Sequence, residues 1–389
     1  MPTPRRLRPA PLPDDLVEKI ILRFPPDDPA GLVDGALVCK DWCRVICSPD
    51  FRRRFREFHR NPPLLGILYR SGGGNRNQQE TNFLPSSTFR LRLPSSDNKQ
   101  IPQWRAIDTL HGRVLLWDES LRRAFTWPEF IVWSPVPSQT RRLPVLRQYM
   151  YTNMWSAALL CAATAGCDHL DCTSSSGAFF VVFVGTDSVT TSAYIYSSEQ
   201  NVWSEAGFVR DHHSVSAGIK RPSARVENTV YFICERSENL LAYELCKKKL
   251  SFVSIPSELS RDYNNRFTAF TAAEDGKLGL ATAVCFRLVT WSREEAGVSL
   301  DGDAGWTQQR EFDLDKLLPS CTLSYRYDFF ATTNNNGVIV VKRNKLLFAI
   351  DLKSGKAKEL LNGCAVQSIY HIVPYIGFCT PSLPQCKFT

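Results

Sequence analysis

Two hydrophobic patterns divide this chain. Over roughly the first sixty residues, apolar side chains recur every three to four positions, as in Leu16, Ile20 and Phe24, with charged residues between them. This spacing predicts amphipathic helices. From residue 64 onward, apolar runs of four to eight residues alternate with turn residues, which is typical of a sandwich, barrel or propeller. We therefore expect a small helical domain followed by an all-β domain.

Proline and acidic residues mark the ends of the predicted helices. Asp14-Asp15 would begin the first helix, where the helix dipole favours negative charge, and Pro25-Pro26 would end it. Asp28-Pro29 and Ser48-Pro49 each pair an N-cap residue with proline at the first helical position. Asn61-Pro62-Pro63 is a strong stop, which predicts a domain boundary there. The apolar faces of the second to fourth helices would contain Leu32, Val33, Ala36, Leu37, Val38, Cys39, Trp42, Val45, Ile46, Phe51, Phe55 and Phe58.

A weak repeat runs through the second part of the chain. Five segments share a strand that ends near a large apolar residue, a polar turn, and a second strand. The aligned residues are Trp133, Tyr196, Tyr243, Trp291 and Ile350, at separations of 63, 47, 48 and 59 residues. Propeller blades repeat at about 40–50 residues, so we expect a β-propeller of about six to eight blades. A β-sandwich with irregular hairpins is the alternative. The clearest core strands are predicted at 64–69, 113–117, 179–184, 229–234 and 337–341.

Composition and charge limit the classes of function. The 389 residues are 43% hydrophobic and 22% charged, and the net charge is +8, so a nucleic-acid partner is not required. Residues 1–11 carry arginines and prolines without an apolar run, which predicts a disordered N-terminus rather than a secretory signal. We expect no membrane-spanning helix. Thirteen cysteines without a signal indicate reduced thiols and a location in the cytoplasm or nucleus.

Residues 12–58 resemble the F-box family. The resemblance rests on a Leu-Pro start at Leu12-Pro13, a Val-Cys-Lys-x-Trp block at 38–42 and a Ser-Pro-x-Phe close at 48–51. It implies a three-helix module over residues 12–60 that binds a Skp-type adaptor, which a cullin–RING ligase holds in turn. It also implies that Leu12, Pro13, Leu16 and Ile20 face the adaptor. Leu32, Val38, Cys39 and Trp42 would build the interior of the module and the rest of its contact surface. Two glycines inside the second helix, Gly31 and Gly35, depart from the common pattern, and each costs about 1 kcal/mol relative to alanine.

Residues 64–381 look similar to the propeller-like associated region of a large group of plant F-box proteins, and we expect this domain to span residues 62–384. The similarity rests on HGRVLLWD at 111–118, AAEDGKLGLA at 272–281 and YIGFCTPSLP at 375–384. It implies a kelch-like domain that binds a protein target, although the double-glycine kelch signature and a Trp-Asp repeat are missing.

Other motifs have simpler interpretations. Cys161, Cys167, His169 and Cys172 lack the paired spacing of a zinc site, so we expect no metal and no cofactor. The helical spacing of Cys39, Cys43 and Cys47 predicts packing as small hydrophobes. The arginine run from Arg52 to Arg60 predicts a solvated helix face rather than a nucleic-acid or nuclear-import patch. No nucleophile motif such as G-x-S-x-G occurs.

The sequence therefore predicts a non-catalytic substrate-recognition subunit of an SCF-type (Skp–cullin–F-box) ubiquitin ligase with an unknown protein target. Two alternatives stay open: a binding scaffold that acts outside ubiquitination, and a propeller enzyme or sugar-binding module with an unrelated helical head.

Overall fold

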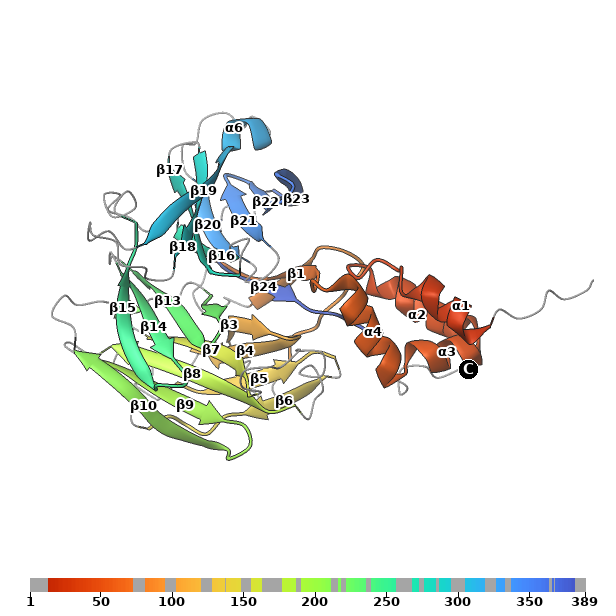
Figure 1. The fold of residues 1–389 in the computed structure, drawn as a ribbon, viewed down its shortest axis with the longest axis horizontal. Helices are drawn as coiled ribbons and strands as arrows, with labels where there is room; N and C mark the ends of the chain where they lie inside the picture. Colours follow the sequence, from red (N-terminus) through yellow and green to blue (C-terminus); the bar gives the residue numbers. More distant parts are fainter. Residues whose placement is uncertain are drawn as a thin grey trace, which may run out of the picture.

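The computed structural model has a helical domain on one side of a ring of small antiparallel sheets (Figure 1). Within 13–381, the residues whose structure is described are 13–72, 81–94, 103–119, 128–136, 138–147, 155–162, 177–186, 190–210, 216–217, 222–235, 239–256, 268–272, 276–284, 287–294, 305–318, 327–332, 337–363, 366 and 368–381. The predicted disordered segment 1–11 lies outside these ranges.

Four helices form the helical domain. They are α1 (Asp14–Ile21), α2 (Pro29–Val38), α3 (Lys40–Ile46) and α4 (Pro49–His59). The predicted proline starts occur as expected: Pro29 and Pro49 open α2 and α4, and the Ser48 hydroxyl accepts a hydrogen bond from the Phe51 amide at 3.1 Å. A buried cluster holds the helices together, and it contains Val17, Ile21, Leu32, Ala36, Cys43, Ile46, Cys47, Phe51 and Phe55.

Gly35 has a packing role that offsets its low helix propensity. A Cβ atom at this position would lie 3.2 Å from the Ile46 side chain and 3.5 Å from Phe24. A contact of 3.2 Å is tighter than most Cβ contacts, so the Ile46 side chain would have to move by a few tenths of an ångström to admit a larger residue. The glycine thus lets these two helices approach closely.

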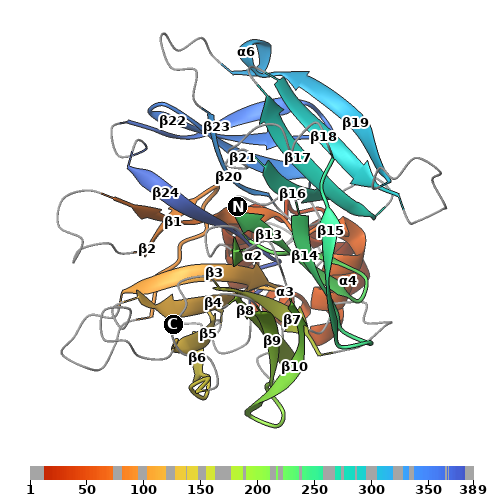
Figure 2. The same cartoon turned by 90° about the vertical axis from the view of Figure 1, so that its left-hand side faces the viewer.

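Six sheets follow the helices and form a propeller (Figure 2). Blade 1 contains β24 (Ile369–Ile376), β1 (Leu64–Ser71) and β2 (Thr81–Pro85). Blade 2 contains β3 (Trp104–Leu110), β4 (Arg113–Asp118), β5 (Phe130–Ser134) and β6 (Gln139–Arg142). Blade 3 contains β7 (Trp155–Cys161), β8 (Phe179–Thr186), β9 (Thr190–Ser197) and β10 (Val202–Arg210).

The remaining blades follow in chain order. Blade 4 contains β11 (Ser216–Ala217), β12 (Ala224–Val226), β13 (Thr229–Glu235), β14 (Asn239–Glu244) and β15 (Lys249–Ser254). Blade 5 contains β16 (Thr268–Ala272), β17 (Leu278–Val284), β18 (Arg287–Arg293) and β19 (Trp306–Asp313), with the short helix α6 (Leu314–Leu317) after it. Blade 6 contains β20 (Tyr327–Thr332), β21 (Val338–Arg343), β22 (Leu346–Asp351) and β23 (Lys356–Asn362). The prediction of a propeller is confirmed, with six blades.

Both ends of the propeller sequence meet in blade 1. The last strand, β24, pairs antiparallel with the first, β1, so that Leu68 lies opposite Val373 and Tyr69 opposite Ile372. β24 is the inner strand of this blade and packs between β20 of blade 6 and β3 of blade 2. This pairing closes the ring.

All five core strands predicted from apolar runs occupy the same place in their blades. They are β1, β4, β8, β13 and β21, and each is the second strand from the centre. A strand in this place has a hydrogen-bonded neighbour on each side and a neighbouring blade on each face. Both faces are therefore buried, as in β4, where residues 113–117 are all buried. Such a strand has a continuous apolar run instead of an alternating pattern.

The five aligned residues of the repeat are also equivalent in the fold. Trp133, Tyr196, Tyr243, Trp291 and Ile350 lie on the third strands β5, β9, β14, β18 and β22, and all five are buried. Four are the last but one residue of their strand, and Trp291 lies one residue earlier because β18 continues to Arg293. The repeat therefore corresponds to blades 2 to 6.

Candidate functional site

The helical domain exposes apolar side chains that its core does not use. Leu16 and Ile20 on α1 are 42% and 43% exposed, and Leu37 and Val38 at the end of α2 are 51% and 63% exposed. Residues four apart lie on one face of a helix, so α1 presents Leu16 and Ile20 together. Exposed large apolar groups on a small folded domain are typical of a protein-binding surface.

The eight residues predicted for the adaptor contact differ in their exposure to solvent. Pro13, Leu16, Ile20, Val38 and Cys39 are exposed, and Trp42 is half-buried. Leu32 is only 1% exposed and belongs to the core, so its role is in the interior of the domain. Leu12 lies outside the described residues. Which of the exposed residues touch an adaptor stays a prediction.

The prediction that Leu32, Val33, Ala36 and Leu37 share one buried face of α2 was wrong in part. Leu32 and Ala36 are buried, whereas Val33 is 44% and Leu37 is 51% exposed. Val33 and Leu37 are four residues apart and form a second apolar face. A helix that is apolar all round is normally buried all round, so the sequence PAGLVDGALV already indicated that α2 needs a partner on both sides.

Cys39 and Phe58 do not lie on the buried faces predicted for them. Cys39 has an extended backbone and caps α3 from outside, with its Sγ accepting from the Trp42 amide at 3.5 Å. Cys43 and Cys47 pack in the core, as predicted, with their sulfurs 3.9 Å apart. In α4, Phe51 and Phe55 are buried, but Phe58 is 55% exposed. His59 packs on Phe55 instead, with ring centroids 4.4 Å apart.

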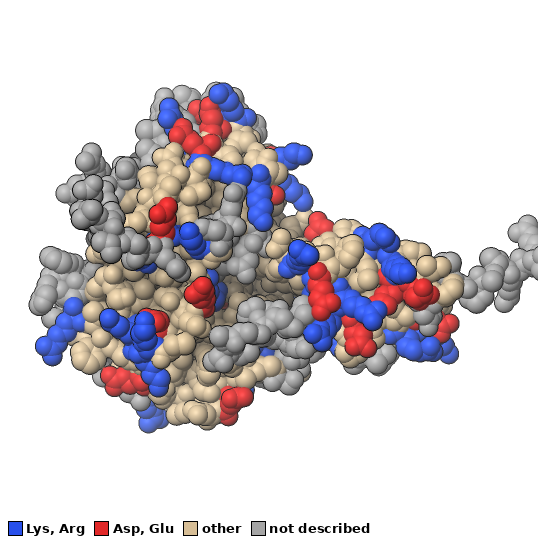
Figure 3. All heavy atoms as spheres, in the orientation of Figure 1, with Lys and Arg blue, Asp and Glu red and all other residues tan. Residues whose placement is uncertain are grey.

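The arginines of α4 form part of a mixed-charge surface. Arg54 contacts Glu18 at 2.9 Å and Arg53 contacts Glu57 at 3.2 Å, and the arginines are more than half exposed. Blue and red side chains alternate over the helical domain in Figure 3. Interspersed charges of both signs are typical of a solvated surface.

The end of the described chain returns to the helical domain. After β24, Phe378 packs into the helical core, and its ring centroid lies 6.1 Å from that of Phe55 in an edge-on contact. The amide of Gly377 donates to the carbonyl of Pro63 at 3.2 Å. The helical domain is thus held to the propeller by the segments before β1 and after β24.

Two groups of buried charges lie at the inner strands of the propeller. In the first, Arg70 forms an ion pair with Glu119, and Arg105 lies 3.6 Å from the same carboxylate. Arg105 also donates to Nδ1 of His371 at 3.4 Å, so that Nε2–H of this histidine donates to the carbonyl of Ala106. These contacts join blade 1 to blade 2.

The second group centres on Asp108 of β3. Its carboxylate accepts hydrogen bonds from the amides of Thr109 at 2.9 Å and Leu159 at 2.8 Å, from Arg225 and from the Ser223 hydroxyl at 3.4 Å. Asp108 therefore joins blade 2 to Leu159 of blade 3 and Arg225 of blade 4. Burial raises the pKa of Asp108 above its ordinary value, although Arg225 and the amide donors act in the opposite direction. Nothing in the local sequence marked this residue.

The structure also bears on the metal and cysteine predictions. Within the described ranges, no group of three or more His, Cys, Asp and Glu side chains could hold a metal ion. Cys161 is half-buried, while Cys167, His169 and Cys172 fall outside these ranges. Seven cysteines are described as free thiols. Burial raises the pKa of Cys379 to about 11, which keeps this thiol protonated and unreactive at neutral pH.

The other sequence signals fit structural roles. Of the tryptophans, Trp104, Trp117, Trp133, Trp203 and Trp291 are buried in the blades. None of the helices whose residues are described is long and apolar enough to cross a membrane.

Comparison with known proteins identifies the helical domain. Residues 11–54 match the model of the F-box domain, which covers α1, α2, α3 and the start of α4. No curated protein matches the chain. The chain therefore has an F-box domain at residues 11–54, followed by a six-bladed β-propeller.

Several solved structures resemble the chain at low identity. One from a nidogen/laminin complex has 11% identity and a TM-score of 0.42, and the match covers 81% of this chain and 99% of that one. U3-55K has 10% identity and a TM-score of 0.36, with 82% and 87% covered. A protein from Desulfotomaculum acetoxidans has 9% identity and a TM-score of 0.40, with 79% and 83% covered. No function transfers from these structures.

Proposed function

We propose that this chain is the substrate-recognition subunit of an SCF-type ubiquitin ligase. In this role the F-box domain binds a Skp-type adaptor, and through it a cullin–RING ligase, while the propeller binds a protein target. The chain carries out no bond chemistry of its own. It works in the cytoplasm or the nucleus, where its free cysteines stay reduced.

The observation that carries this proposal is the pair of unused apolar faces on the F-box domain. α1 presents Leu16 and Ile20, and α2 presents Val33 and Leu37, all between 42% and 51% exposed. An adaptor that covered these side chains would remove them from water, and complete burial of one such side chain contributes about 1.5–3 kcal/mol.

The firm connection between the two domains supports the same role. A ligase receptor acts by holding its target near the ubiquitin-loaded enzyme, which raises the effective concentration of the acceptor lysine. This gain depends on geometry, because a domain that swings freely spends less time in the productive orientation. The packing of Phe378 on Phe55 limits such swinging.

The adaptor contact can be tested with exposed residues only. We expect the double variant Leu16→Glu/Ile20→Glu to lose at least about tenfold in affinity for a purified Skp-type adaptor, because it places charges in an apolar contact. Its melting temperature should stay close to that of the wild type, since both side chains lie outside the buried core and are already partly exposed to water. Calorimetric titration measures the affinity, and a thermal melt followed by circular dichroism measures the melting temperature.

A matched control uses exposed apolar residues of the propeller. Val202 and Phe208 on β10 are 48% and 60% exposed, so Val202→Glu/Phe208→Glu makes the same change of charge far from the F-box domain in sequence. This control should bind the adaptor normally. Undiminished adaptor binding by Leu16→Glu/Ile20→Glu would contradict the proposed surface. Two further observations separate a ligase receptor from a scaffold. Cullin should co-purify with the wild type, and the target should turn over more slowly when the Leu16→Glu/Ile20→Glu variant replaces the wild type.

Removal of the Phe378 ring should loosen the connection between the domains. We expect Phe378→Ala to increase amide hydrogen exchange in α4 by several-fold, because the aromatic contact with Phe55 contributes about 0.5–1.5 kcal/mol beyond the buried area. Exchange in the core strands of blades 3 and 4 should not change. Equal exchange in α4 of the variant and the wild type would show that the contact does not restrain the F-box domain.

A further inference from the structure

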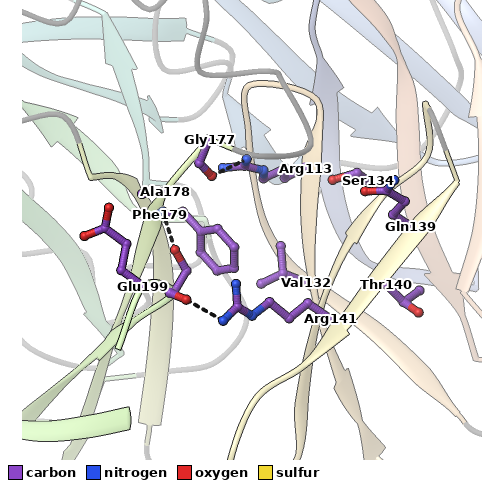
Figure 4. Close-up of a pocket in the computed structure, with 11 residues that line it drawn as sticks. Arg113, Val132, Ser134, Gln139, Thr140, Arg141, Gly177, Ala178, Phe179 and Glu199 are labelled. Carbon is purple, nitrogen blue, oxygen red and sulfur yellow. Dashed lines mark hydrogen bonds between the residues drawn. The ribbon is translucent and has the colours of Figure 1, made fainter. Parts of the chain in front are cut away.

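A pocket of about 530 Å³ lies between blades 2 and 3 (Figure 4). Its wall in blade 2 is formed by β4, β5 and β6, and its wall in blade 3 by the start of β8 and the turn after β9. The volume is within the range of ligand pockets. Val132 and Phe179 supply the apolar part of the lining, and both are buried.

Two arginines from blade 2 face this pocket. The guanidinium of Arg113 lies 5.0 Å from the centroid of the Phe179 ring, and that of Arg141 lies 5.8 Å from the same centroid and 6.0 Å from that of Tyr196. Arg113 donates to the carbonyl of Gly177 at 2.6 Å, and Arg141 donates to the carbonyl of Ser198. The rings and carbonyls thus fix the directions of both guanidinium groups.

The contacts of Arg141 orient its positive charge without neutralising it. A carbonyl and an aromatic ring carry no net charge, and a guanidinium has five N–H donors, of which Arg141 uses one on Ser198. Among the described residues, no carboxylate lies within ion-pair distance of Arg141. Among the lining residues that the structure describes, Glu199 alone is acidic, and Figure 4 shows its carboxylate pointing away from both guanidinium groups.

The rest of the lining fits an oxyanion on a carbon stem. Ser134, Gln139 and Thr140 bring neutral hydrogen-bond donors to the rim, and guanidinium groups bind carboxylate and phosphate oxygens through paired N–H donors. The rim residues Gln139, Thr140 and Arg141 are exposed. Because the rim is open, the pocket can admit a side chain from a peptide segment that lies across the surface. A small molecule would bind in a more enclosed site.

We propose that this pocket binds an oxyanion-bearing side chain, a carboxylate or a phosphoryl group, of an acidic segment in a protein partner. The identity of this partner as the ligase target rests on the proposed function. The pocket itself can be tested without adaptor or cullin, so a failure here is distinct from a failure of adaptor binding.

The neighbouring arginine provides a charge-matched control. Arg141 and Arg142 are adjacent on β6, and successive side chains of a strand point to opposite faces. Arg142 is 69% exposed and lies 4.0 Å from Glu129, outside the pocket lining. Arg141→Gln and Arg142→Gln therefore remove the same charge, but only the first removes it from the pocket.

The experiment measures fluorescence anisotropy of two labelled peptides with the full chain at physiological salt. One peptide is an oligo-glutamate, and the other is a Gly-Ser peptide with a single phosphoserine. We expect at least one of them to bind, and Arg141→Gln to weaken that binding about tenfold or more because a charge-assisted contact is lost. Arg142→Gln should change it by less than about twofold, as for an exposed charge outside the site. The peptide that binds identifies carboxylate or phosphoryl recognition.

A gain of affinity provides a second readout that misfolding cannot imitate. Glu199→Gln removes the acidic group of the lining and should tighten binding of the same peptide by about two- to fivefold, within the range for one exposed charge. The proposal is overturned if neither peptide binds the folded wild type, if Arg141→Gln and Arg142→Gln weaken binding equally, or if Glu199→Gln fails to tighten it.

Discussion

A chain that ends at Gly363 is expected to be unfolded at room temperature, although it keeps the F-box domain and five complete blades. The deletion removes β24, whose Ile369, Ile372, Val373 and Tyr375 are each at most 4% exposed. Full burial of one such side chain contributes about 1.5–3 kcal/mol. Four of them together account for an amount comparable to the whole stability of an ordinary domain, which is about 5–15 kcal/mol.

The position of β24 makes its loss worse than the loss of an edge strand. β24 is the inner strand of blade 1 and belongs to two buried clusters, one shared with blade 2 and one with blade 6. Without it, β1 loses a hydrogen-bonded partner and the ring opens between two blades. Circular dichroism and limited proteolysis provide the measurement, with a chain ending at Pro381 as the control. A shortened chain that melts cooperatively near the wild-type temperature would show that blade 1 does not close the propeller.

Asp108→Leu is expected to lower the free energy of unfolding by about 3–5 kcal/mol, the usual cost of removing one partner of a buried ion pair. Leucine has the same branched shape and the same number of side-chain heavy atoms as aspartate, so it leaves no cavity and the loss comes from the polar groups. The Leu159 amide would lose its acceptor at 2.8 Å. Arg225, whose side chain is 14% exposed, would keep a charge without its carboxylate. Urea denaturation followed by tryptophan fluorescence measures the change.

A double-mutant cycle separates the loss of the contact from the cost of the unpaired charge. Arg225→Met removes the other partner, and replacement of both members of a buried ion pair by apolar residues is often nearly neutral. We therefore expect Asp108→Leu/Arg225→Met to recover more than half of the stability lost in Asp108→Leu, with a coupling energy in the range of about 0.5–3 kcal/mol for residues in contact. Additive losses in the double variant would show that the two side chains do not act as a pair.

The blades that could be recognised in the sequence are those encoded by one continuous segment. Trp133, Tyr196, Tyr243, Trp291 and Ile350 recur because each hairpin of a third and fourth strand is local in the chain. Blade 1 gave no repeat, since its described sheet ends at the third strand β2 and has no third-and-fourth-strand hairpin, and its inner strand β24 comes from the opposite end of the propeller sequence. An apolar run predicted β1, but no local pattern shows that a strand some three hundred residues later completes its sheet.

In the F-box domain, too, some features followed from the local sequence and others depended on how the helices pack. Proline marked where α2 and α4 begin, with a side-chain cap from Ser48 at α4 but none from Asp28 at α2, and the spacing of Phe51 and Phe55 determined the buried face of α4. Which face of α2 is buried depended on the close approach to α3 at Gly35, and this approach is a property of the packed helices. Val33 and Leu37 therefore became visible as a surface only in the folded domain.

The two-domain order, the F-box domain, the propeller class and the location of the core strands follow from local sequence, because hydrophobic period, caps and turns act between residues that are close in the chain. The charge clusters and the pocket arise from contacts between distant parts of the chain. Asp108 meets partners up to 117 residues away, and Arg113 and Arg141 meet carbonyls 64 and 57 residues away. Such contacts depend on how blades lie against one another in space, and the spacing of residues along the chain does not encode this arrangement directly.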